Sequence, residues 1–408
     1  MYRILLAFCL LAITSQLSAQ CGGRYFWDTF ENIEITEDIL YGNNVDYLGA
    51  SQDLFVDFFE PTGDTETERP LVVLAHGGFF IAGDRKAADI YALCTDLAEK
   101  GYACASIQYR LGVGTLELDS LGFSKAVIRG VQDARAAVRY FRQEATTYKI
   151  DPDQIFIGGT SAGGVLAMHY AYLQDTTILD DWINDAIQEL GGLEGNSGNP
   201  GFSSDIKAVV SFAGAIKNIS WMADVDIPVA STHGTADGVV PYGYGWVGFP
   251  LTDFITVPIT PMFGSEKIHE ELDARGIDND FLSFEGAGHV PHVDELGLDP
   301  VNYALTLDLI TEFLHRQLDC YAPLGLSGVQ PEFLDVRPNP ASNYIKLDLP
   351  QGKMYLEVYN TAGQRVMGFA DQGSQAYVFS RSGLKEGLYL LQISFEDGSR
   401  FTAKVSFQ

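Results

Sequence analysis

Between residues 51 and 318, short uninterrupted apolar runs alternate with longer segments in which apolar residues recur at helical spacing. Residues 71–75 read Leu-Val-Val-Leu-Ala, a run typical of a strand that is buried on both faces. Comparable runs predict strands at 102–109, 154–157, 206–212, 227–232 and 281–284, and the spaced pattern predicts helices near 87–100, 124–145, 266–275 and 303–317. The alternation predicts an α/β fold, with helices on both faces of a mostly parallel sheet.

Two segments interrupt this alternation. Residues 175–205 are rich in Gly, Asn and Asp, and residues 242–264 contain the aromatic side chains Tyr242, Tyr244, Trp246, Phe249 and Phe254. Insertions that follow the carboxyl ends of strands tend to cover the binding crevice of an α/β sheet. We therefore expect the aromatic segment to contribute to a pocket. The alternative is that its rings pack only within their own loop.

The pattern changes again after a Pro- and Gly-containing linker at residues 321–331. Short alternating segments near 344–349, 354–358, 388–393 and 403–407, separated by turns, predict a small all-β sandwich. The charge changes at the same place. The whole chain carries a formal net charge of −28, whereas residues 331–408 hold eight Lys or Arg and eight Asp or Glu. We predict a domain boundary near residue 325.

The first 19 residues resemble a secretory signal peptide, with Arg3 before an apolar stretch and Leu-Ser-Ala before Gln20. The predicted organisation is thus a signal peptide at 1–19, a catalytic domain at 20–325, and a linker with a small domain at 326–408. The apolar stretch is too short for a membrane span, so the predicted product is exported and soluble. Its acidity argues against nucleic acid or anionic membrane as a partner.

Four cysteines remain after removal of the signal peptide, which is an even number in an exported chain. Cys21 and Cys320 stand at the two ends of the large domain and are placed to form one bridge. Cys94 and Cys104 lie level on a predicted helix and strand, so they either pair or remain small buried hydrophobes.

A possible nucleophile lies between the predicted strand at 154–157 and the helix that follows. Residues 159–163 read Gly-Thr-Ser-Ala-Gly, and a serine on a sharp glycine-flanked turn projects above the sheet edge. Ser161 would need a base to remove its proton. His289, after Gly-Ala-Gly on a loop, is the favoured base and His292 the competitor. Asp237, after a predicted strand, would orient the base, and the N–H of Ala162 would stabilise an oxyanion.

These motifs, together with His-Gly-Gly-Phe at residues 76–79, resemble the α/β-hydrolases of the carboxylesterase and lipase type over residues 51–318. The order Ser161, Asp237, His289 is the order of that family. The resemblance implies further oxyanion-hole donors at Gly78 and Phe79. Phe79 departs from the family's third glycine, so its ring must point away from the oxyanion, toward an acyl pocket. His76 would brace the loop.

Three motifs near the C-terminus resemble the C-terminal sorting domain of type IX secretion. They are Arg-Pro-Asn-Pro-Ala-Ser-Asn at 337–343, Val-Tyr-Asn-Thr-Ala-Gly-Gln at 358–364, and Gly-Leu-Tyr-Leu-Leu-Gln-Ile at 387–393. The resemblance implies the type IX machinery as a partner and passage through the periplasm to the cell surface or medium. The last residues lack a second basic residue that many members have. A carbohydrate-binding sandwich is the alternative for this segment.

Together these features predict an exported serine carboxylesterase that works through an acyl-enzyme, with no cofactor and no metal. A serine peptidase of the prolyl-oligopeptidase type is the nearest alternative, although the chain lacks that group's propeller and has Ala162 where its elbow often has Tyr. An inactive hydrolase-fold adhesion protein is a third. Acylated plant polysaccharides, lipid esters and polyesters all fit as substrates.

Overall fold

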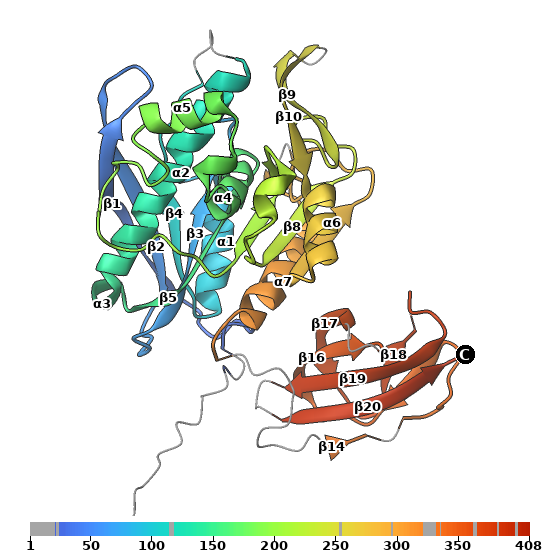
Figure 1. Ribbon diagram of the computed structural model, residues 1–408. Helices are drawn as coiled ribbons and strands as arrows, with labels where there is room; N and C mark the ends of the chain where they lie inside the picture. Colours follow the sequence, from blue (N-terminus) through green and yellow to red (C-terminus); the bar gives the residue numbers. More distant parts are fainter. Residues whose placement is uncertain are drawn as a thin grey trace, which may run out of the picture.

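The larger domain is organised around an eight-stranded sheet, seen in the computed structural model in Figure 1. The structure describes residues 21, 24–113, 118–252, 255–294, 297–320, 332–334, 336–361, 365–381, 383–395 and 399–408. The predicted signal peptide and the predicted boundary at residue 325 lie outside these residues. In spatial order the strands are β1 (Ile33–Val45), β2 (Ser51–Pro61), β4 (Ala103–Ile107), β3 (Arg69–Ala75), β5 (Ile150–Thr160), β6 (Val209–Phe212), β8 (Val229–Gly234) and β11 (Asn279–Phe284).

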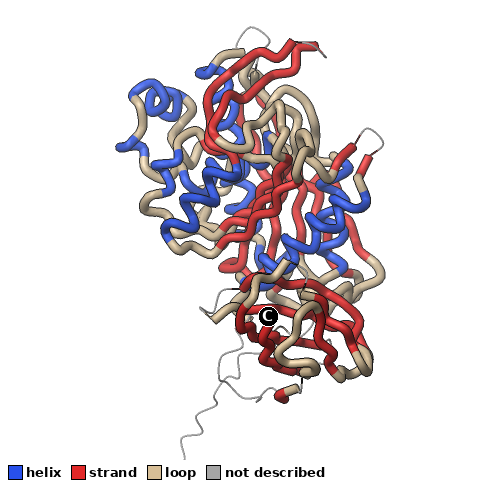
Figure 2. Tube along the Cα trace, turned by 90° about the vertical axis from the view of Figure 1, so that its right-hand side faces the viewer, coloured by secondary structure: helices blue, strands red, loops and turns tan. Residues whose placement is uncertain are grey.

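The sheet is antiparallel at one edge and parallel elsewhere. β2 pairs antiparallel with both β1 and β4, and every pair from β4 to β11 is parallel. The seven helices in the described part of the chain are α1 (Ala88–Glu99), α2 (Ser120–Gln143), α3 (Ala145–Tyr148), α4 (Ala162–Tyr172), α5 (Asp181–Glu189), α6 (Ser265–Arg275) and α7 (Pro300–Arg316). Figure 2 shows helices on both sides of the central strands. The predicted α/β fold is confirmed.

Alternate residues of the central strands supply two hydrophobic cores. In β3, Leu71 and Val73 pack with helices α2 and α4, while Val72 and Leu74 pack with α1 and α7. All four side chains are fully buried, which explains the uninterrupted apolar run in the sequence. Acidic side chains cap two of the helices, since Asp119 accepts from Gly122 N and Asp299 accepts from Val301 N and Asn302 N.

The two interrupting segments contain secondary structure. Residues 175–205 include a short 3-10 helix (Thr176–Ile178) and α5, whose Glu189 pairs with Lys125 of α2. The other segment forms an arm of β9 (Tyr244–Thr252) and β10 (Ile255–Gly264), which rises beyond the sheet in Figure 1. β10 also pairs with β7 (Ala215–Ile216). The remaining short elements are a 3-10 helix (Ile219–Met222), β12 (Val293–Asp294) and β13 (Gly297–Leu298).

The smaller domain is a β-sandwich with its own core. A five-stranded sheet contains β14 (Glu332–Phe333), β20 (Arg400–Phe407), β19 (Gly387–Phe395), β16 (Gly352–Tyr359) and β17 (Arg365–Gly373). It faces a two-stranded sheet of β15 (Tyr344–Leu347) and β18 (Tyr377–Ser380). Ile345, Leu356 and Ile393 are fully buried between the sheets. Figures 1 and 2 place this domain at the opposite end of the molecule from the β9–β10 arm.

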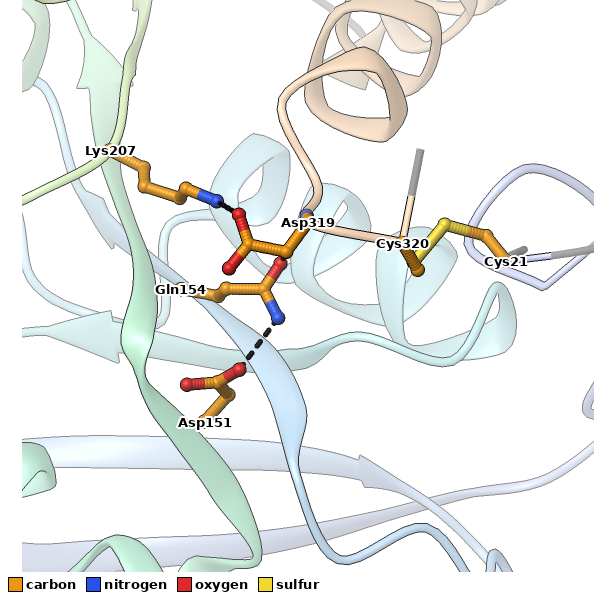
Figure 3. Close-up of a disulfide and its surroundings, with 6 residues drawn as sticks. All are labelled: Cys21, Asp151, Gln154, Lys207, Asp319 and Cys320. Atoms are coloured by element: carbon orange, nitrogen blue, oxygen red, sulfur yellow. Dashed lines mark hydrogen bonds and ion pairs between the residues drawn. A yellow bond between two sulfur atoms is a disulfide. The ribbon is translucent and has the colours of Figure 1, made fainter. Parts of the chain in front are cut away.

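A disulfide joins the start of the described chain to the end of the large domain (Figure 3). It links Cys21 and Cys320 across a sequence separation of 299 residues, as the sequence suggested. Beside it, Asp319 N donates to Gln154 Oε1 at 2.9 Å. Cys94 and Cys104 are free buried thiols. Of the two alternatives left open by the sequence, the structure therefore shows small buried hydrophobic residues and not a second disulfide. Within the described residues, no helix is long and apolar enough to cross a membrane.

Candidate active site

Ser161 occupies the single residue between the end of β5 and the start of α4. Its backbone is in an unusual conformation, with φ 56° and ψ −113°, which most side chains avoid. The flanking glycines make the turn possible, because a Cβ on Gly159 or Gly163 would lie 2.3 or 2.0 Å from Ala75 O. Ser161 N donates to Phe212 O at 2.7 Å, which ties the turn to the neighbouring strand.

Three side chains from separate loops meet at this turn. His289 Nε2 lies 2.8 Å from Ser161 Oγ, and His289 Nδ1 lies 2.7 Å from Asp237 Oδ2. The Asp237 side chain is fully buried, while the His289 side chain remains 22% exposed. The structure therefore brings together the serine, acid and base that the sequence selected, at distances suited to proton transfer.

Asp237 is held as a carboxylate by its surroundings. Its Oδ1 accepts from Val239 N at 2.8 Å and from Val240 N at 3.0 Å. Burial alone would raise the pKa of Asp237, but hydrogen bonds with His233 and His289 outweigh it and hold that pKa well below its usual value. An ionised Asp237 keeps the proton of His289 on Nδ1, so that Nε2 can accept the proton of Ser161.

His233 is a neighbour of the acid to which the sequence assigned no role. Its Nε2 faces two acceptors, Asp237 Oδ2 at 3.1 Å and Val240 O at 3.2 Å, so this nitrogen carries the proton. Its Nδ1 then accepts from Ser265 Oγ at 2.8 Å. His233 is a positioning residue for Asp237. Its place four residues before the acid, at the end of the same predicted strand, was the available signal.

The loop after β3 passes directly over the serine. A Cβ on Gly77 would lie 3.4 Å from Ser161 Cβ, and the next residues turn sharply, with φ 116° at Gly78 and 59° at Phe79. Within the described part of the chain, the N–H groups of Gly78 and Phe79 donate to no other backbone group. Ala162 N–H is the first of α4 and has no intrahelical acceptor.

His76 braces this loop from beneath. Its ring is buried and stacks on Tyr109 at a centroid distance of 4.4 Å, and Tyr109 Oη donates to His76 O at 2.8 Å. Burial lowers the pKa of His76, so the ring is neutral and its Nδ1–H donates to Gly77 O at 2.6 Å. This position agrees with the bracing role expected from the sequence.

The Phe79 ring packs within an aromatic cluster. It packs edge-on against Phe123 of α2 at 5.4 Å and against Phe249 of the β9–β10 arm at 5.0 Å. The arm therefore contacts the loop over the serine through Phe249. Tyr244 and Trp246 of the same arm are 62% and 60% exposed, so not all of its aromatic rings line the site.

His292, the competing base, lies elsewhere. Its ring is fully buried, and its Nε2 lies 3.8 Å from Asp89 Oδ2 rather than beside Ser161. Among the described residues, no three His, Cys, Asp or Glu side chains are grouped so that they could hold a metal ion.

Two family models match the chain. Residues 56–222 match the BD-FAE family, and residues 335–407 match the secretion system C-terminal sorting domain. The first match contains the loop at 76–79 and Ser161. Both resemblances that the motifs predicted are confirmed.

Several curated proteins are similar over a limited stretch. The para-nitrobenzyl esterase of Bacillus subtilis (strain 168) is 32% identical over 114 residues, which are 28% of this chain and 23% of that protein. Neutral cholesterol ester hydrolase 1 of Mus musculus is 34% identical over 111 residues, 26% of this chain and 25% of that protein. Neuroligin-like protein glit-1 of Caenorhabditis elegans is 29% identical over 112 residues, which are 27% of this chain and 14% of that protein. The chain thus spans a quarter or less of these relatives.

Among solved structures, the apo form of Thermogutta terrifontis esterase 2 is 22% identical, and the match covers 72% of this chain and 97% of that chain with a TM-score of 0.49. A truncated carbohydrate esterase from gut microbiota is also 22% identical, and its match covers 71% of this chain and 97% of that chain with a TM-score of 0.48.

Proposed function

We propose that this chain, an α/β-hydrolase of the carboxylesterase and lipase type that carries a type IX secretion sorting domain, is an exported serine carboxylesterase. The observation that carries the proposal is the continuous contact from Ser161 Oγ through His289 to Asp237, at 2.8 and 2.7 Å. Serine becomes a nucleophile at neutral pH only when a base is positioned to take its proton.

In the proposed reaction, Ser161 Oγ attacks the ester carbonyl carbon while His289 Nε2 takes the hydroxyl proton. The carbonyl oxygen becomes an oxyanion, which accepts hydrogen bonds from Ala162 N–H and from the N–H groups of Gly78 and Phe79. His289 returns the proton to the leaving alcohol oxygen, the C–O bond breaks, and an acyl-enzyme remains. Water, deprotonated by His289, attacks the acyl carbon, and the acid leaves as Ser161 regains its proton.

The charge that develops on His289 is stabilised in place. Attack makes the ring an imidazolium, and the buried Asp237 carboxylate lies 2.7 Å from its Nδ1. Two backbone N–H groups and His233 hold that carboxylate, so it need not reorganise during the reaction. The proposed scheme uses no cofactor.

The small domain is proposed to act in export rather than in catalysis. It matches the sorting-domain model over residues 335–407 and lies at the opposite end of the molecule from the β9–β10 arm, which contacts the loop over the serine. We propose that the signal peptide directs the chain to the periplasm and that the sorting domain directs it onward to the cell surface or medium.

Labelling and turnover test the catalytic proposal. A fluorophosphonate probe should attach to Ser161, and Ser161→Ala should lose the label and lower kcat on nitrophenyl butyrate by roughly 10⁶-fold. Ser283→Ala is the matched control, because this hydroxyl is exposed on β11 and bonds only to Tyr242 Oη in the described structure. Methyl ferulate, acetyl-xylan and long-chain nitrophenyl esters identify the substrate class. Normal activity in Ser161→Ala would refute the proposal.

A further inference from the structure

We propose that Asp89 and His292 form a positioning pair that holds the loop carrying His289 in register with Ser161. The inference rests on the proposed catalytic role of Ser161 and His289. It assigns a function to a carboxylate whose side chain is 12% exposed and to a fully buried imidazole, neither of which the proposed reaction uses.

The backbone beside His289 is strained. Val290 has φ 52°, in the left-handed region that β-branched residues avoid. Such a conformation persists only where the surrounding structure enforces it, and strained residues of this kind cluster at active sites. The conformation of Val290 sets the direction in which the chain leaves His289. The loop therefore needs fixed points on both sides of the strained residue.

The fixed points before His289 are hydrogen bonds to the loop that carries Asp237. Gly286 N donates to Thr235 Oγ1 at 2.8 Å, and Ala236 N donates to Ala287 O at 2.9 Å. These contacts hold the base beside its acid. They do not hold it beside Ser161, which lies on a different strand.

His292 is the fixed point after Val290. Its side chain is fully buried and its ring packs edge-on against Phe212 at 5.3 Å. His292 O also accepts from Asp299 N at 3.0 Å, which ties the loop to the start of α7. Neither ring nitrogen has a hydrogen-bond partner among the described residues, yet Nε2 lies 3.8 Å from Asp89 Oδ2. A buried imidazole is costly unless a polar group faces it, and Asp89 is that group.

Asp89 connects this anchor to the nucleophile. It lies in the first turn of α1, and its Oδ2 accepts from Thr160 Oγ1 at 2.6 Å. Burial alone would raise the pKa of Asp89, but the contacts with His292 and Thr160 outweigh it and lower that pKa, so the group is a carboxylate at neutral pH.

Two routes therefore join His292 to the serine. One runs through Asp89 to Thr160, the residue before Ser161. The other runs through Phe212: its ring packs against His292, and its backbone carbonyl accepts a hydrogen bond from Ser161 N at 2.7 Å. The His292 side chain thus lies against both residues that hold the turn at Ser161, Asp89 and Phe212. Loss of the pair should change the alignment of His289 with Ser161, which lowers kcat, and should leave substrate binding and KM largely unchanged.

The test combines removal of the anchor with relief of the strain. His292→Phe keeps a ring against Phe212 and removes both nitrogens, and Val290→Gly allows the left-handed conformation without strain. We expect His292→Phe to lower kcat on nitrophenyl butyrate, and the rate of fluorophosphonate labelling, about 10- to 30-fold with KM within about twofold. We expect Val290→Gly alone to lower kcat by no more than about threefold, and the double variant to match Val290→Gly within about threefold.

His269→Phe is the matched control. This histidine is also buried and also packs against a phenylalanine, stacking on Phe281 at 4.6 Å, but it lies on α6 and its Nδ1 lies 2.6 Å from Asn279 Oδ1 of β11. It should change the melting temperature without changing kcat. If His292→Phe does not fold, Asp89→Asn replaces it in the same scheme, because it removes the charge that faces His292 and leaves the backbone unchanged.

Two results would overturn the inference. One is a folded His292→Phe enzyme with kcat within twofold of the unmodified enzyme. The other is a double variant of His292→Phe and Val290→Gly that is no more active than His292→Phe alone. That result would mean that the pair stabilises the fold without positioning His289. Hydrogen exchange of residues 285–294 adds a readout that needs no activity: it should be faster in His292→Phe and not in His269→Phe. If Ser161→Ala remained active, the proposed function would fail while this exchange experiment would still test the anchor.

Discussion

Replacement of Asp237 by asparagine tests the proposed triad most directly, because the structure dictates how the amide must be oriented. Oδ1 of Asp237 accepts two backbone hydrogen bonds, from Val239 N and Val240 N, at 2.8 and 3.0 Å. Only the carbonyl oxygen of an asparagine can occupy that place. The amide nitrogen must then stand where Oδ2 stands, 2.7 Å from His289 Nδ1 and 3.1 Å from His233 Nε2.

The amide nitrogen is a donor, so His289 has to present an acceptor to it. For His289 this places the proton on Nε2, which then donates toward Ser161 and cannot take its proton. The oxyanion-hole donors and the substrate pocket are unchanged by the substitution. We therefore expect Asp237→Asn to lower kcat about 10⁴-fold, equivalent to roughly 5 kcal/mol of transition-state stabilisation, with KM within a few-fold.

The assay is steady-state hydrolysis of nitrophenyl butyrate by folded protein, with circular dichroism as the check on folding. Asp294→Asn is the control, since Asp294 is an exposed carboxylate five residues after His289. Its kcat should stay within about twofold of the unmodified enzyme. A kcat for Asp237→Asn within tenfold of the unmodified enzyme would refute the argument. So would a larger loss in Asp294→Asn.

Three further predictions concern the whole molecule. The enzyme should hydrolyse nitrophenyl butyrate and leave alanyl and prolyl anilides nearly untouched; a comparable kcat/KM on the anilides would instead identify a peptidase. Burial lowers the pKa of His169 and of His269 to about 4, whereas an unfolded histidine titrates near 6.5, so the unfolded state binds more protons between these values. Stability should therefore be full above about pH 6.5 and fall toward pH 4, by at most about 3 kcal/mol for each histidine, as urea denaturation at a series of pH values would measure; a flat profile would contradict it. A protein of residues 20–325 should fold and keep kcat on small esters within a few-fold, because the two cores of the large domain contain no residue of the small one. In the native host it should remain in the periplasm; its appearance in the medium would contradict the sorting role.

The sequence alone determined the features that depend on neighbouring residues. The uninterrupted apolar runs predicted buried parallel strands, because a strand covered on both faces has no polar side. The predicted helices near 87–100 and 266–275 correspond to α1 and α6 within two residues at either end. The turn at Ser161 was equally predictable, since only glycine fits beside Ala75 O at positions 159 and 163.

Local patterns were less informative where the stabilising partner is distant in the chain. Residues 242–264 contain Gly and Pro and were expected to be a loop, but β9 and β10 pair with each other, and β10 also pairs with β7. The composition of residues 175–205 likewise concealed α5. α5 packs Ile183, Ala186 and Ile187 into the core against residues distant in the sequence, and these few apolar positions stand among Gly, Asn and Asp residues that suggested a loop.

The tertiary structure alone decided which of the candidate side chains meet. His289 and His292 are three residues apart and chemically identical, yet one reaches Ser161 across 128 residues of sequence and the other is buried against Phe212 and Asp89. The sequence offered His292 only as the competing base and gave Asp89 no role. Both outcomes follow from the direction in which the chain leaves the strained Val290. That direction is set by packing among β5, β6, α1 and α7, and long-range packing of this kind leaves no periodic signal in the chain.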